Sequence, residues 1–236
     1  MILEVCCGNL ESALLAAKNK VERIELCSAL ALGGLTPSFE EVDILNKETN
    51  LELMILVRPR AGNFVYSKQE KQLVKRQINS LAKYNVKGFV IGVLDANANV
   101  DFSFLKSISN EFGEDFSFTF HRAFDFVKQP FEALDKIVDL GFERILTSGQ
   151  QPNAVEGIEL VFQLIEKAKN RISIMPGSGI NSNNITQFLK INKLSEIHLS
   201  CKKVVGSNEI GKPFNVEEYF LDETELLKVQ EIITRK

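Results

Sequence analysis

The sequence predicts a single (β/α)8 barrel domain spanning residues 1–236. Eight strand-like segments alternate with eight helical segments, as in a series of parallel crossovers. Dividing 236 residues by eight gives about 30 residues per unit, close to the roughly 250 residues usual for this fold. No linker or shift in composition marks a second domain. An open doubly wound sheet is the alternative, which the count of eight units and the lack of a linker disfavour.

The strand predictions rest on short apolar runs, several of which alternate with polar residues. In chain order they are Ile2–Cys6, Arg23–Cys27, Glu52–Val57, Gly88–Leu94, Phe116–His121, Arg144–Ser148, Ile172–Met175 and Glu196–Leu199. A helical pattern follows each strand, at Leu10–Lys20, Phe39–Lys47, Lys68–Tyr84, Phe102–Glu111, Pro130–Leu140, Ala154–Lys169, Asn183–Asn192 and Glu223–Thr234. Helix caps are expected at Ser38, Ser67, Asp101, Ser182 and Asp222.

Composition argues against several classes of protein. Charged residues make up 25% of the chain and hydrophobic residues 44%, as in ordinary globular proteins. The net charge of -3 gives no reason to expect nucleic acid or an anionic membrane as a partner. No apolar run approaches the ~18 residues of a membrane span, and no signal peptide pattern precedes the first strand. Four scattered cysteines are too few for a disulfide framework, so we expect a cytoplasmic protein.

The first two predicted strands share a pattern of apolar residue, Glu, apolar residue, Cys. It occurs at Leu3-Glu4-Val5-Cys6 and again at Ile24-Glu25-Leu26-Cys27. Because side chains alternate along a strand, each Glu shares a face with its Cys, and this face points away from the covering helices. Buried acids are costly unless they belong to a site or are neutralised. The pattern therefore predicts two carboxylates and two thiols side by side in the barrel.

Active sites of this fold lie at the C-terminal ends of the strands. Strand parity and the following loops bring several polar residues there. Glu25, Asp95, His121 and His198 are the candidates for acid–base catalysis. The candidates for binding an anionic ligand are Arg58, Arg60, Arg122 and Ser148, with the loop Gly177, Ser178 and Gly179 as a phosphate cradle before a helix. An internal salt-bridge network is the alternative explanation of the buried charges.

Some neighbouring residues have structural interpretations. Cys7 points toward the helices by parity and is expected in the core. Glu4 lies one layer below the mouth and is expected to orient Arg58 or His198. Asp125 is a candidate cap for the helix that begins at Pro130.

A series of short motifs runs along nearly the whole chain, among them Arg23-Ile24-Glu25-Leu26-Cys27, Gly33-Gly34-Leu35-Thr36-Pro37-Ser38, Val57-Arg58-Pro59-Arg60, Phe120-His121-Arg122-Ala123-Phe124-Asp125 and Gly177-Ser178-Gly179-Ile180. In these motifs and their order the chain resembles the CutC family. It implies a (β/α)8 barrel, a cytoplasmic homo-oligomer, for which we favour a dimer, and a link to copper tolerance or Cu(I) binding. Cys201-Lys202-Lys203 departs from the small residues that follow strand 8 in the family.

Two hypotheses of function remain open at this point. In the first, Cys6 and Cys27 bind Cu(I), which prefers soft thiolates. The lack of a Cys-x-x-Cys motif and the nearby Arg58 and Arg60 count against a cation. In the second, the protein is an enzyme that acts by acid–base chemistry on a small anionic or sugar-like ligand. The fold does not decide between a metal ion and a small molecule as the ligand.

Overall fold

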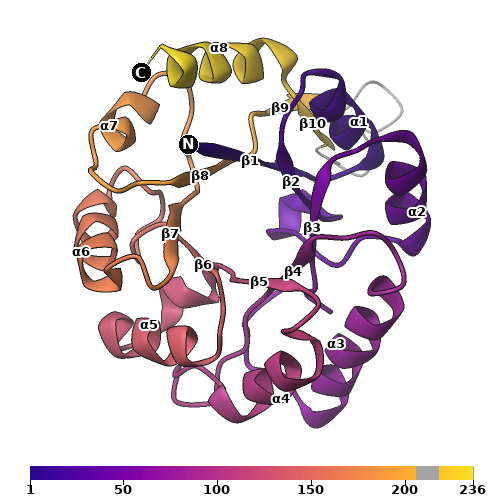
Figure 1. Ribbon diagram of the computed structural model, residues 1–236, viewed down its shortest axis with the longest axis vertical. Coiled ribbons are helices and arrows are strands. Elements are labelled where there is room, and N and C mark those ends of the chain that lie inside the picture. The colour runs from indigo at the N-terminus through magenta and orange to yellow at the C-terminus, as the bar shows by residue number, and fades with distance from the viewer. Residues whose placement is uncertain (206–217, 236) are drawn as a thin grey trace, which may run out of the picture.

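Eight parallel strands surround a central axis in the computed structural model, which describes residues 1–205 and 218–235 (Figure 1). The hydrogen-bonded order is β7-β6-β5-β4-β3-β2-β1-β8, and β7 and β8 lie beside each other, so that the ring nearly closes. The strands are β1 (Ile2–Cys7), β2 (Arg23–Leu26), β3 (Glu52–Leu56), β4 (Gly88–Ile91), β5 (Ser117–Phe120), β6 (Arg144–Thr147), β7 (Ser173–Pro176) and β8 (Glu196–Leu199). The predicted barrel is confirmed.

Helices cover the outside of the ring (Figure 1). They are α1 (Leu10–Lys18), α2 (Phe39–Glu48), α3 (Lys68–Leu81), α4 (Phe102–Phe112), α5 (Pro130–Asp139), α6 (Ile158–Ala168), α7 (Ile185–Leu189) and α8 (Glu223–Thr234). The 3-10 turns η1 (Leu30–Leu32) and η2 (Arg122–Phe126) lie in the loops after β2 and β5. None of the helices in the described part of the chain has the length and apolar character to cross a membrane.

The predicted helix caps are confirmed with one exception. Ser38 and Ser67 each form a capping box, and Asp101 and Asp222 accept backbone N–H groups at their helices. The cap expected at Ser182 is wrong, because α7 begins only at Ile185. The backbone N–H and the hydroxyl of Ser182 instead bind the carboxylate of Glu225, which joins this loop to α8.

The two faces of the strands follow the predicted alternation. Val5, Ile24 and Leu26 are completely buried in the large core between strands and helices, and Cys7 lies with them as expected. The opposite faces point into the barrel, where a small apolar cluster consists of Cys6, Cys27, Met54, Leu56 and Val90. Glu25 of the inner face lies in register with Cys6 and Met54 of this cluster.

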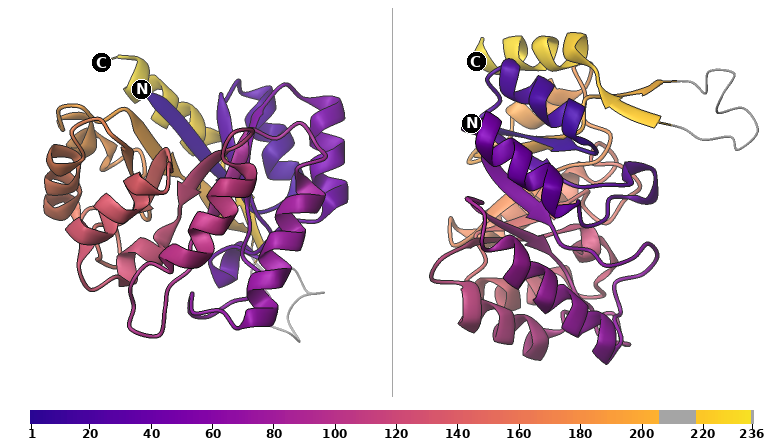
Figure 2. Two further views of the ribbon diagram at one scale, coloured as in Figure 1. Left: turned by 60° about the horizontal axis from the view of Figure 1, so that its bottom comes forward. Right: turned by 90° about the vertical axis from the view of Figure 1, so that its right-hand side faces the viewer.

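A two-stranded antiparallel sheet after β8 is absent from the sequence prediction. β9 (Lys202–Val205) pairs with β10 (Glu218–Leu221), and the pair extends beyond the ring of helices (Figure 2). Its base is fixed by Asn9, which donates a hydrogen bond to the carbonyl of Tyr219 at 2.9 Å. β9 is exposed at every position, so it lacks the alternation of buried and exposed residues that reveals a strand.

Candidate functional site

A cavity of about 240 Å³ lies at the C-terminal ends of the strands. We call it the mouth cavity. Six of the charged, thiol or imidazole side chains that line it are Cys6, Glu25, Arg58, His121, Arg122 and His198. This is the position at which barrels of this kind place their active sites.

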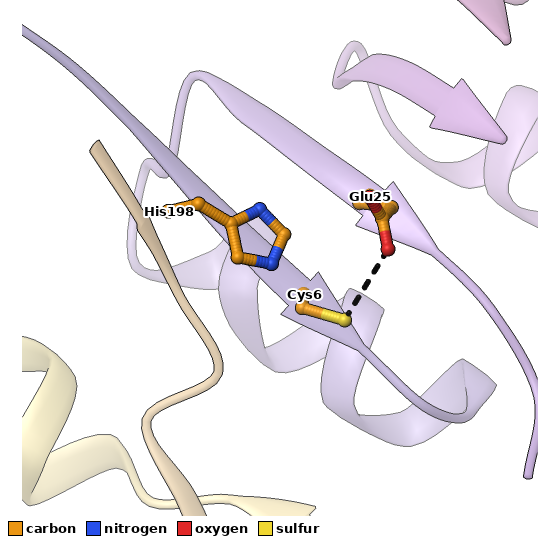
Figure 3. Close-up of side chains that lie close together, drawn as sticks. All are labelled: Cys6, Glu25 and His198. Atoms are coloured by element: carbon orange, nitrogen blue, oxygen red, sulfur yellow. Dashed lines mark hydrogen bonds between the residues drawn. The ribbon is translucent and has the colours of Figure 1, made fainter. Parts of the chain in front are cut away.

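Cys6, Glu25 and His198 converge on one point of the mouth cavity from the neighbouring strands β1, β2 and β8 (Figure 3). One ligand atom from each lies within 4.8 Å of the others. Strand register explains the convergence, because Cys6 pairs directly with Glu25 and its neighbour Val5 pairs with Leu199. The thiol of Cys6 donates a hydrogen bond of 3.7 Å to Oε1 of Glu25.

Cys27 lies beside this group. Its Sγ is 3.8 Å from the Sγ of Cys6, so the two thiols predicted to face the barrel interior are in contact. Cys27 is completely buried beneath the cavity wall, whereas Cys6 lines the cavity itself. The contact with Cys27 and burial raise the pKa of the Cys6 thiol well above its usual value.

His198 is held by a chain of buried charges. Its Nδ1 donates to Oε1 of Glu4 at 2.8 Å, and Oε2 of Glu4 accepts from Nε of Arg23 at 2.7 Å. Arg23 also binds Glu196, and Arg144 binds Glu196 from the other side. The internal salt-bridge network considered as an alternative therefore exists beneath the mouth cavity. This salt-bridge network includes Glu4 but does not include Glu25.

These surroundings shift the pKa values of Glu4, His198 and Glu25. Burial raises the pKa of Glu4, but the hydrogen bond from His198 and the nearby cations outweigh it, so the pKa is lowered. Burial alone would lower the pKa of His198, yet its contacts with Cys6, Glu4 and Glu25 raise it well above 6.5. Burial raises the pKa of Glu25 to about 7, although the His198 cation opposes this. Glu25 thus changes its protonation near neutral pH.

His121 is held neutral on another side of the mouth cavity. Its Nδ1 accepts the backbone N–H of Ala123 at 3.0 Å, so the neutral ring carries its proton on Nε2. Burial and the charge of Arg58 lower its pKa to about 3. The ring packs on Phe64 with centroids 4.8 Å apart. A Cβ at Gly92 would lie 2.4 Å from Nδ1, so only glycine fits beneath the ring.

Arg58 and Arg60 have different surroundings. Arg58 lines the mouth cavity, but Nη1 donates to the carbonyls of Leu32 and Gly34 and Nη2 to that of Gly62. Its guanidinium therefore joins two loops and contributes a fixed positive charge. Arg60 does not line the cavity and binds Glu70 at the start of α3 together with groups of its own loop.

Arg122 lies at the opening of the mouth cavity and is oriented by two neighbours. Nε donates to Asp125 at 2.8 Å and Nη2 to the hydroxyl of Ser148 at 2.9 Å. Asp125 also accepts from Thr147 and from the Ser148 backbone, so it fastens η2 to the end of β6 rather than capping α5. Ser148 itself does not line the cavity, because its hydroxyl is taken up by Asp125.

The remaining candidates lie partly outside the mouth cavity. Asp95 accepts the backbone N–H groups of Asn97 and Asn99, which turns its carboxylate into its own loop. Ser178 and Gly179 line the cavity, whereas the N–H of Gly177 donates to the carbonyl of Thr147 and continues the sheet. The helix α7 that follows has five residues, too few for the expected phosphate cradle at a helix N-terminus.

Phe64 and Lys202 also line the mouth cavity, and the sequence pattern predicts neither of them there. Both come from segments that return over the mouth, the loop after β3 and the start of β9. Strand parity carries no signal for either position.

Comparison with known proteins gives a consistent result. The sequence model of the CutC family matches residues 1–203. A CutC family protein of Histophilus somni is 39% identical over 211 residues, covering 89% of this chain and 86% of that protein. The human copper homeostasis protein cutC homolog is 36% identical over 237 residues, covering 97% of this chain and 86% of the human protein.

Solved structures resemble the chain at two levels. The crystal structure of a copper homeostasis protein CutC from Streptococcus agalactiae has a TM-score of 0.79 and 29% identity, and the match covers 85% of this chain and 98% of that one. Phosphoribosylanthranilate isomerase from Thermotoga maritima has a TM-score of 0.58 at 11% identity, covering 97% of this chain and 96% of that one. The second likeness concerns the barrel fold alone.

Proposed function

Because the chain belongs to the CutC family, we propose that it acts in copper homeostasis by binding one Cu(I) ion at the floor of the mouth cavity. The ligands in this proposal are the thiolates of Cys6 and Cys27 and the imidazole of His198. The observation that carries the proposal is the contact between the two thiols, with Sγ atoms 3.8 Å apart, beside an imidazole. Soft sulfur ligands with an imidazole favour Cu(I) or zinc over hard cations.

The distance between the thiols limits the geometry of the proposed ion. With metal–sulfur bonds of about 2.3 Å, the length known for zinc thiolates, two sulfurs 3.8 Å apart subtend an angle of about 110° at the ion. This angle suits three or four ligands and excludes a linear pair without movement. His198 is the natural third ligand, because its Nδ1 is occupied by Glu4 and its Nε2 remains for a metal.

Proton release accompanies binding in this proposal. The raised pKa of Cys6 means that the thiol is protonated at neutral pH, and only the thiolate binds a metal. The imidazolium of His198 must also lose its Nε2 proton. Glu25 lies against Cys6 and is the nearest carboxylate able to accept a proton or to act as a fourth ligand. Cu(I) affinity should therefore rise with pH.

A competition titration against a Cu(I) chelator, under anaerobic and reducing conditions, tests the proposal. We expect about one Cu(I) per chain, and no binding by the Cys6→Ser, Cys27→Ser double variant at concentrations that saturate the wild type. Cys201→Ser is the matched control, because Cys201 lies outside this group in the core packing. Equal competition by the wild type and the double variant would mean that the two thiols serve only as packing.

An acid–base enzyme is a second candidate, favoured by a specific observation. Oε2 of Glu25 and Nε2 of His121 are buried, belong to cavity-lining residues and have no hydrogen-bond partner among the residues that the structure describes. Polar atoms that lack partners in a cavity are candidates for contact with a ligand. Neither residue is among the three ligands Cys6, Cys27 and His198 of the first proposal, so Cu(I) binding and catalysis can be measured separately.

We also propose a cytoplasmic homo-oligomer, with a dimer as the simplest assembly. All four cysteines, Cys6, Cys7, Cys27 and Cys201, are free, which supports a reducing compartment. Light scattering on the purified protein tests the assembly, since a mass near 26.5 kDa would be that of the monomer.

A further inference from the structure

Three buried polar atoms of residues that line the mouth cavity lack a partner among the described residues; one is Nε of Arg58, and the other two, an Oε2 and an Nε2, lie on different sides of the cavity. Oε2 belongs to Glu25 of β2 and Nε2 to His121, which follows β5, and β3 and β4 lie between these two strands. Glu25 is 5% exposed and His121 4% exposed. Buried polar atoms normally find partners, and here no partner is present among the described residues. A ligand between them would supply a hydrogen-bond acceptor for His121 and a group that exchanges hydrogen with Glu25.

We propose that the mouth cavity binds a small anionic carbonyl compound and that Glu25 exchanges a proton on the carbon next to the carbonyl group. His121 donates its Nε2–H to the carbonyl oxygen, and Arg122 binds the anionic group. This inference specifies the substrate class of the acid–base candidate and requires no copper.

His121 suits the role of a fixed donor to the carbonyl oxygen. Its Nδ1 is occupied by the backbone N–H of Ala123, which leaves Nε2 as the donor. The ring cannot turn or withdraw freely, because Gly92 lies directly against it and Phe64 packs on its face. A neutral imidazole can polarise a carbonyl group without itself giving up a proton. Placed where negative charge develops, such a donor stabilises the transition state.

Glu25 suits the role of the proton carrier. Its Oε1 is fixed by the thiol of Cys6, whereas Oε2 is directed to no protein group that the structure describes. A buried carboxylate that lines the cavity, with one oxygen held by a thiol and the other left without a partner, has the geometry of a general base.

Arg122 suits the anionic part of the ligand. Asp125 and Ser148 hold Nε and Nη2, and Nη1 has no hydrogen-bond partner in the part of the chain that the structure describes. The side chain is 40% exposed at the opening of the cavity. Lys202 lines the same opening and adds a second positive charge. An oriented guanidinium is the preferred group for a carboxylate or phosphate.

The proposed step balances without an oxidant or a metal. The ionised Glu25 takes a proton from the carbon beside the carbonyl group, and the electron pair of the C–H bond forms a C=C bond. The π electrons of the carbonyl move to its oxygen, which accepts the hydrogen bond from His121. In the reverse step Glu25 returns a proton to the carbon. When Glu25 has exchanged its proton with heavy water in between, the compound gains deuterium.

Proton NMR in heavy water tests the proposal with the full chain, purified metal-free with a chelator. The probes are pyruvate and dihydroxyacetone phosphate, and lactate and glycerol 3-phosphate are the analogues without a carbonyl group. We expect the C–H signals of at least one carbonyl probe to disappear faster than without protein, and those of the analogues to persist. Exchange of neither carbonyl probe would overturn the proposal.

Variants identify the groups responsible. Glu25→Gln should lower the exchange rate at least ~100-fold, and His121→Asn about 10- to 100-fold, in line with the loss of a general base and of an oxyanion donor. Arg122→Ala should mainly raise the probe concentration needed for half-maximal exchange. Glu40→Gln, an exposed control, should exchange as the wild type. Undiminished exchange in Glu25→Gln overturns the proposal. If Glu25→Gln does not fold, the exchange rate of Glu25→Asp is measured in its place.

Cu(I) titration of the same wild-type preparation separates this inference from the copper proposal. Exchange without Cu(I) binding supports the inference and overturns the proposed copper function. Cu(I) binding without exchange supports copper handling and overturns the inference.

Discussion

Nδ1 of His198 lies 2.8 Å from Oε1 of Glu4, directly across the pairing of β8 with β1. The same carboxylate accepts a hydrogen bond from Arg23, so a fully buried Glu4 joins the floor of the mouth cavity to the ion network beneath it. This contact fixes the orientation of the His198 imidazole and leaves Nε2 as its free nitrogen. This pair couples the stability of the barrel to the chemistry of its mouth.

Glu4→Gln should therefore affect stability and ligand binding together. It leaves the buried Arg23 and His198 without their shared carboxylate, and breaking such a pair costs about 3–5 kcal/mol of unfolding free energy. Cu(I) affinity should fall about 10- to 100-fold, as for other groups that orient a metal-binding histidine. Urea unfolding and the chelator competition measure the two effects. The exposed variant Glu48→Gln should change stability by less than about 0.5 kcal/mol, and a similarly small change in Glu4→Gln would contradict the coupling.

His121 should make the protein sensitive to acid. Its pKa is about 3 in the folded protein against 6.5 ordinarily, so the unfolded chain binds a proton more readily as the pH falls below 6.5. The stability that the neutral ring contributes is complete above pH 6.5 and is lost as the pH falls toward 3, by about 5 kcal/mol in all. Urea unfolding between pH 7 and pH 4 measures the loss.

His121→Asn should flatten this acid limb, because asparagine has no group that titrates there. The amide oxygen can still accept the N–H of Ala123, which keeps the local turn. An equally steep loss of stability in the variant would assign the acid limb to other groups.

The sequence predicts most of the barrel interior because two simple rules apply there. Alternation along a strand separates Cys6 from Cys7, and the parallel order places Glu25 and His198 on either side of β1. The fold's preference for sites at the C-terminal ends of the strands then places these side chains in one cavity.

The sequence does not predict the contacts of the loop side chains, because several local hydrogen-bond partners are within reach of each. Arg60 and Asp95 lie close to the mouth in sequence, yet each is satisfied within its own loop. Arg58 reaches the cavity with both Nη atoms already bound to carbonyls. Asp125 fastens η2 to β6 instead of capping α5. Such contacts depend on the path of the backbone, on which strand periodicity has no bearing.

Arg122 and Arg60 should differ sharply in anion binding. Phosphate titrated into the wild type should bind at the mouth, where Arg122 has a free Nη1 among the described residues. Arg122→Ala should weaken this binding by about 1.5–3 kcal/mol, the contribution of a hydrogen bond to a charged group. Arg60→Ala should leave it unchanged, because that guanidinium is directed to Glu70 and its own loop. Isothermal calorimetry makes the comparison, and equal losses in both variants would argue against Arg122 as the anion-binding residue.

Glu25 should reduce stability as the pH rises through neutrality. Its pKa is about 7 in the folded protein against 4.5 ordinarily, so between these values the folded state retains a proton that the unfolded chain has lost. Stability is therefore lost between pH 4.5 and pH 7, by about 3–4 kcal/mol, with no further change above. Glu25→Gln, which cannot ionise, should be more stable than the wild type at pH 8 and about equal to it at pH 4.5. Urea unfolding at the two pH values measures the difference. A variant less stable than the wild type at pH 8 would mean that the charged Glu25 stabilises the fold, and would contradict the raised pKa of this carboxyl.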